Sequence, residues 1–182
     1  MSEQTTSNEA AISELTALHQ AIEAEFKARI PAFEHVEAYA ELGKDMGEPA
    51  LLFAMTGAAP APDAGTGKTA LNCRFQAAVL VDATRKRAPL QAAILASRVA
   101  VVLHGQYWDV DFVEEPTHIQ VLPDGSVPEL AQYCVWVVEW FQVVHFGEFE
   151  WPWEDEPPGS LLFGIHPGAV DPDAPLVAPE AP

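Results

Sequence analysis

Basic residues are scarce in this sequence. It holds 9 Lys and Arg against 27 Asp and Glu, which gives a formal net charge of −18. A chain with this charge repels phosphate backbones and anionic membrane surfaces, so we expect no binding to DNA, RNA or such a membrane. The excess of acid has two interpretations of equal weight: it serves solubility alone, or it forms an acidic docking surface.

Cysteines and long apolar runs are also few. Cys73 and Cys134 each stand in an apolar run and are expected to be small buried residues, and nothing in the sequence requires a disulfide between them. Arg98, Glu139 and Gln142 interrupt the longest apolar stretches, so we expect no helix that spans a membrane. The first residues have neither the basic nor the apolar part of a signal peptide. The sequence therefore predicts a soluble protein made in the cytosol.

One short stretch, Gly65 to Thr69, ends like a phosphate-binding loop. The full motif needs another glycine where this chain has Pro62, which offers no backbone N–H to a phosphate. The motif also requires a helix directly afterwards, whereas Leu71 to Val81 has the composition of a strand. We therefore do not expect a nucleotide site here.

Other patterns of catalysis or metal binding are weak. The carboxylates at Asp109, Asp111, Glu114 and Glu115 lack the spacing of a calcium loop, so a solvated acidic turn is favoured over cation binding or acid–base chemistry. No serine or cysteine stands in a nucleophile elbow. The histidines share no metal-binding spacing with one another or with the cysteines; they are His19, His35, His104, His118, His145 and His166. We expect no catalytic residue, metal or cofactor.

The apolar periodicity changes along the chain between that of helices and that of strands. Thr6 to Glu9 fits a capping box that begins a helix, and Pro31 ends it. The later elements expected are strands at 33–40, 50–55, 69–83, 116–122 and 130–146, a loop at 57–67, a turn at 123–125 and a helix at 89–103. Together they predict an α+β fold, with a mixed or antiparallel sheet of about four to five strands and two packed helices.

The strand expected at 130–146 is apolar in both of its alternating sets of residues. Such a strand should be covered on both faces, and in a small domain one cover can come from a neighbouring subunit. Trp136, Trp140 and Phe141 belong to it, and two interpretations have equal weight: an ordinary core, or aromatic anchors of a subunit interface.

The composition changes at Gly147. Residues 148–182 contain no Lys or Arg, many prolines and a series of acidic residues. They also contain Trp151 and Trp153, which a plain linker does not need. We therefore divide the chain into an α+β domain at 1–147 and an extended, acidic, proline-rich arm at 148–182 that docks on another surface.

Four stretches together resemble the tail terminator and minor tail proteins of long-tailed bacteriophages, in particular the Mu-like phages. They are AISELTALHQAIEAEFKARIPAF, EPALLFAM, CRFQAAVLVDATRKRAPLQAAILASRVAVVL and YCVWVVEWFQVVHFG, and the resemblance covers roughly residues 9–165. It rests on spacing and composition rather than on a catalytic motif. It implies a structural protein of the virion tail, assembled in the host cytoplasm, that forms a hexameric ring on the tail tube, stops its growth and meets the head-side connector. It implies no enzymatic activity and no cofactor, and it leaves the role of the arm open.

The charge pattern is compatible with a ring of identical subunits. The middle of the chain is basic, and no Lys or Arg occurs after Arg98; the basic residues are Arg74, Arg85, Lys86, Arg87 and Arg98. The basic part of one subunit would therefore attract the acidic part of the next in a head-to-tail contact. Two alternatives stay open: a head–tail connector or other neck subunit, and a small acidic binding or inhibitor module. An enzyme with an unrecognised site has only the carboxylates near Trp108 to support it.

Overall fold

The computed structural model describes residues 3–39, 47–62, 65, 67–125 and 130–147, with side chains from residue 14 onward. The predicted arm, with Trp151 and Trp153, lies outside the described residues. The predicted division of the chain at Gly147 stays a prediction.

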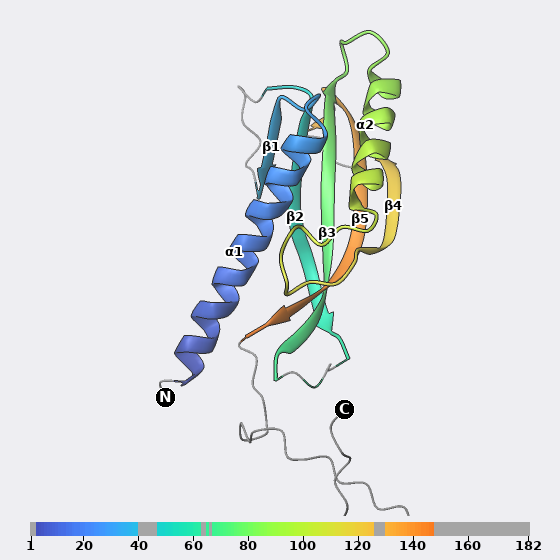
Figure 1. The fold of residues 1–182 in the computed structure, drawn as a ribbon. Helices are drawn as coiled ribbons and strands as arrows, with labels where there is room; N and C mark the ends of the chain where they lie inside the picture. Colours follow the sequence, from blue (N-terminus) through green and yellow to red (C-terminus); the bar gives the residue numbers. More distant parts are fainter. Residues whose placement is uncertain (1–2, 40–46, 63–64, 66, 126–129, 148–182) are drawn as a thin grey trace, which may run out of the picture. The chain divides into compact units, whose positions relative to one another are not determined.

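The described residues form a five-stranded mixed sheet and two helices, which confirms the predicted α+β fold (Figure 1). The elements are α1 (Glu3–Arg29), β1 (His35–Ala38), β2 (Ala50–Pro60), β3 (Thr69–Asp82), α2 (Ala88–Leu103), β4 (Thr117–Asp124) and β5 (Tyr133–Phe146). The sheet order is β1-β2-β3-β5-β4. β1 pairs with β2 in parallel, and the other neighbours are antiparallel.

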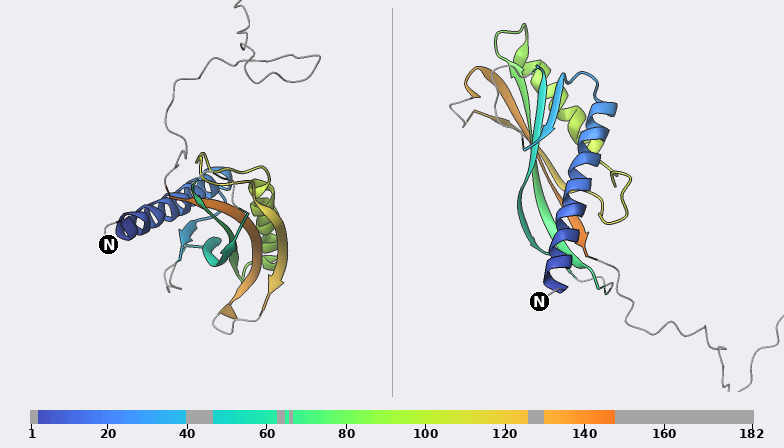
Figure 2. Two further views of the ribbon diagram at one scale, coloured as in Figure 1. Left: turned by 90° about the horizontal axis from the view of Figure 1, so that it is seen from below. Right: turned by 90° about the vertical axis from the view of Figure 1, so that its left-hand side faces the viewer.

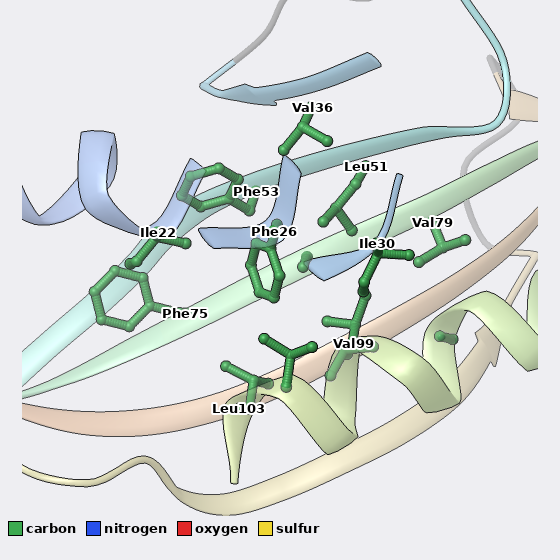
Figure 3. Packing of buried hydrophobic residues seen from close by; sticks show 14 of the residues in the cluster. Ile22, Phe26, Ile30, Val36, Leu51, Phe53, Phe75, Val79, Val99 and Leu103 are labelled. Atoms are coloured by element: carbon green, nitrogen blue, oxygen red, sulfur yellow. The ribbon is translucent and has the colours of Figure 1, made fainter. Parts of the chain in front are cut away.

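Both helices pack on the same face of the sheet (Figure 2). In α1, Leu18, Ile22 and Phe26 recur at every fourth residue and are fully buried against the strands. In α2, a row of alanines at 88, 92 and 96 lets the backbone approach the sheet closely. Figure 3 shows side chains from both helices converging on those of β2 and β3. The result is a two-layer domain with one main core.

Three predicted boundaries are wrong. α1 begins at Glu3, so Thr6 to Glu9 lie inside the helix and do not begin it. The predicted turn at 123–125 is partly strand, because β4 continues through Asp124. The predicted loop at 57–67 begins too early, because β2 continues to Pro60, which pairs with Leu71.

A proline is tolerated in β2 because of where the neighbouring strand ends. β1 pairs with β2 only as far as Phe53, so the remainder of β2 is an edge and Pro60 needs no N–H on its outer side. An irregularity between Met55 and Gly57 shifts the register of this hairpin. Such a bulge increases the local twist of the pair.

One polar network lies inside the main core. Gln142 of β5 is fully buried. It accepts a hydrogen bond from Nε1 of Trp108 at 2.9 Å and donates one to the carbonyl oxygen of Glu114 at 2.7 Å. Trp108 also packs edge-on against Phe26, at 5.6 Å between ring centroids, and has a left-handed backbone with φ 56. The network therefore holds the segment between α2 and β4 against the core.

His19 is the other buried polar residue among those described. Its Nδ1 donates to the carbonyl oxygen of Leu15 at 2.7 Å, and its Nε2 has no partner within the described part of the chain. The rings of Tyr39, Phe53 and Phe75 lie 5.0, 5.8 and 5.9 Å away. Burial lowers the pKa of His19 below its ordinary value of 6.5, and the hydrogen bond to Leu15 opposes this only in part.

Acid is therefore expected to destabilise the fold through His19. Below pH 6.5 the unfolded chain takes up a proton on this residue that the folded chain resists, so stability falls as the pH drops toward the lowered pKa and is unaffected above 6.5. Urea unfolding at a series of pH values measures the effect. In His19→Phe the loss over that interval should shrink, and an unchanged pH dependence would show that other groups cause it.

Candidate assembly surfaces

The face of the sheet opposite the helices, called the open face, carries several exposed apolar side chains. Val137, Phe141 and Val143 of β5 alternate along it and are half-buried, and Leu122 of β4 is 57% exposed. Only the Val135 end of β5 is buried on this side, in a small cluster with Ala50 and Leu80. Within the described protomer the helices cover one face of β5 alone, so a second cover from a neighbouring subunit stays a prediction.

A charged cluster occupies the middle of the open face. Glu139 of β5 accepts hydrogen bonds from Nε of Arg74 at 2.9 Å and from Nε2 of Gln76 at 2.8 Å. The bond from Arg74, and then that from Gln76, lower the pKa of Glu139 below its ordinary value. The cluster fixes these side chains across β3 and β5, and it leaves the apolar residues on both sides of it accessible.

The predicted aromatic anchors fall on different faces. Trp140 is fully buried under the helices and stacks on Phe75, with 5.2 Å between ring centroids. Its assignment as an interface residue is wrong, because the protomer itself covers it. Trp136 is on the same side and packs against the main core, partly buried. Phe141 points to the open face, where its ring meets that of His118 at 5.9 Å, and it remains available for a partner.

A second uncovered surface is the hollow between α1 and α2, called the helix groove. Its volume is about 590 Å³ at the end lined by Arg29, Ile94, Arg98 and Val101. It continues along α2 past Leu90 toward the turn that precedes this helix. Leu90, Ile94 and Val101 are 55%, 47% and 74% exposed. They form an apolar stripe on the side of α2 that faces away from the sheet.

The five basic residues predicted to form an interface lie in three different places in the structure. Lys86, Arg87 and Arg98 all line the helix groove. Arg85 instead binds the carbonyl oxygen of Glu48 and lies 3.9 Å from a carboxylate oxygen of Glu34. Arg74 is on the open face, on the other side of the sheet.

Two features of the helix groove were not predicted from the sequence. Arg29 lines it although it belongs to α1, and only the packing of the two helices brings it there. The exposure of Leu90 and Ile94 on α2 was not predicted either. Their exposure was detectable, because alanines at every fourth position already mark the buried side and leave larger apolar residues on the outside.

The weaker candidate sites have ordinary structural roles. The chain after Gly65 to Thr69 is strand β3, as predicted, and not the helix that a phosphate-binding loop requires. Glu114 lies 3.1 Å from His145, and Glu115 lies 3.3 Å from His104. Across the described residues, no group of three or more histidines, cysteines or carboxylates is arranged to hold a metal ion.

No protein-family model matches the chain, and no curated protein matches it. In the described part of the chain, no helix has the length and apolar character needed to cross a membrane.

Proposed function

We propose that this protein is a non-enzymatic structural subunit that assembles with copies of itself into a ring. Its specific role in this proposal is that of a tail terminator of a long-tailed phage: a hexameric ring in the virion tail that caps the tail tube and meets the head-side connector. The resemblance of the sequence to that family supplies the specific role.

One structural observation supports ring assembly. The described protomer leaves two different apolar surfaces uncovered, the open face and the helix groove, and they lie on opposite layers of the domain. Exposed apolar surface of this kind marks sites of protein contact. A contact between either surface and a different part of the next copy is heterologous, and a heterologous contact closes into a ring when the rotation between copies permits it.

The charge fits the proposed partners. Each chain carries a net charge of −18, and a ring whose lumen is lined by acidic residues would let DNA pass without retaining it. The tail tube protein and the head–tail connector would bind through protein surfaces, and neither a membrane nor a specific nucleic acid sequence is required.

The native mass of the purified chain tests assembly. We expect a hexameric species in native mass spectrometry and rings in negative-stain electron microscopy. Phe141→Asp should weaken assembly at least about tenfold, because it replaces an apolar contact on the open face with a carboxylate that a partner would have to desolvate. Tyr107→Asp is the matched control, since Tyr107 is 50% exposed and lies outside both surfaces. A monomer at every concentration and salt, or rings unaffected by Phe141→Asp, would contradict the proposal.

Electron microscopy of a phage that lacks the gene separates a terminator from a connector. Loss of a terminator gives overlong tails, because nothing stops the growth of the tube. Loss of a connector gives tails of normal length without heads, and that result would replace the proposed role with the connector role.

A further inference from the structure

The helix groove is positively charged in a strongly acidic protein. Arg29, Lys86, Arg87 and Arg98 line it, and its lining contains no acidic residue. Lys86, Arg87 and Arg98 form no ion pair with any residue that the structure describes. Arg29 lies 3.5 Å from Glu25. The groove therefore offers unneutralised cations beside an apolar floor.

We propose that the acidic arm of a second copy of this chain binds in the helix groove, with Trp151 and Trp153 against the apolar stripe of α2. This inference rests on the proposed ring, and it names the segment of a neighbouring subunit that covers the helix groove. The other possible occupants, the chain's own arm or a different protein, are outcomes of the test below.

The sequence of the arm complements the groove. Trp151 and Trp153 stand among Glu150, Glu154 and Asp155, and no Lys or Arg occurs anywhere in residues 148–182. Tryptophan contributes a large apolar area with little loss of conformational entropy, which makes it an effective anchor in an apolar groove. The flanking carboxylates would face the cations at the rim, where opposite charges set specificity and the rate of association.

Chain length favours the arm of another copy over the chain's own. The backbone N–H of Gly147 donates to Oε2 of Glu14 at 3.1 Å, so the arm begins beside the middle of α1. Arg29 is about 22 Å farther along the helix at 1.5 Å per residue. Trp151 and Trp153 are four and six residues beyond Gly147, and extended chain carries them at most about 14 Å and about 22 Å, so the chain's own Trp151 stops short of the groove. The arm of a neighbouring copy has no such restriction.

Cross-linking of a mixture of isotopically labelled and unlabelled full-length chains tests the proposal. A carbodiimide joins the Nζ of Lys86 to carboxylates of the arm, and chymotrypsin then releases peptides for mass spectrometry. In an equal mixture, about half of the cross-linked pairs should combine a labelled and an unlabelled peptide, because each link joins two copies. Lys27, which is exposed on α1 and does not line the groove, is the internal control and should give several-fold fewer links to the arm.

Two variants of the full chain add a functional measurement. Ile94→Asp changes the apolar floor of the groove, and Trp151→Ala with Trp153→Ala changes the arm. Each should weaken self-association in analytical ultracentrifugation by roughly thirtyfold, the size of an anchor residue at an interface. Tyr107→Asp, outside both surfaces, should leave it unchanged.

The outcomes separate this contact from the proposed function. Links within single copies only, or no links from Lys86 to the arm while rings remain intact, overturn the docking and leave the ring in place. Intact self-association in both variants overturns it as well. A chain that stays monomeric overturns the docking and the proposed function together.

Discussion

Replacing Trp140 with alanine is expected to lower the free energy of unfolding by about 3–5 kcal/mol, the usual loss for a large aromatic residue deleted from a core. Trp140 is fully buried and stacks on Phe75 beneath the helices. Alanine would leave a cavity bounded by β3 and β5, which the rest of the sheet holds apart. Urea unfolding followed by far-ultraviolet circular dichroism measures the loss without depending on tryptophan emission.

Trp136 provides the control for this variant, because it is on the same strand and the same face but is only partly buried. Trp136→Ala should lower the free energy of unfolding by clearly less than Trp140→Ala does. Equal losses of unfolding free energy would mean that the two tryptophans contribute equally to stability despite their different burial in the protomer. A negligible cost for Trp140→Ala would mean that Trp140 is not in the core.

Replacing Gln142 with leucine should lower the free energy of unfolding by about 2–4 kcal/mol, although leucine is apolar and similar in size. The substitution would leave two groups without their partners, the buried Nε1 of Trp108 and the carbonyl oxygen of Glu114, whose bond to Gln142 is partly buried. Each unsatisfied buried group costs about 1–3 kcal/mol. Chemical denaturation measures the change, and Gln120→Leu, on an exposed part of β4, should be close to neutral.

A double variant shows whether the hydrogen bond causes this loss. Trp108→Phe removes the donor, so that combining it with Gln142→Leu should cost less than the sum of the two single changes. Strictly additive costs would indicate that the two side chains act independently.

The elements of the fold were predictable because their signals are local. The apolar period of four residues in α1, the proline after it and the alternation along β3 and β5 each follow from a short stretch of sequence. The extension of β2 to Pro60 was not predictable, because a proline is acceptable there only where β1 has already ended. That depends on the pairing of two strands, which local sequence does not contain.

The candidate surfaces show the same limit. Alternation placed Trp140 and Phe141 on opposite faces of β5, but it did not determine which face the helices cover. A run of three basic residues likewise gave no sign that Lys86 and Arg87 would meet Arg98 in the helix groove while Arg85 binds the carbonyl oxygen of Glu48. Side-chain directions at a turn depend on how the next helix packs.

The position of β5 between β3 and β4 also has a consequence for biosynthesis. β5 is the last strand among the described residues, yet it lies inside the sheet, so β4 has no neighbouring strand in this sheet until Tyr133 to Phe146 have been made. A nascent chain that stops before this point exposes the unpaired edge of β3, and unpaired edges in incomplete chains promote aggregation. Translation must therefore pass Phe146 before the sheet can close, and chaperones that shield strand edges would act on the shorter nascent chains.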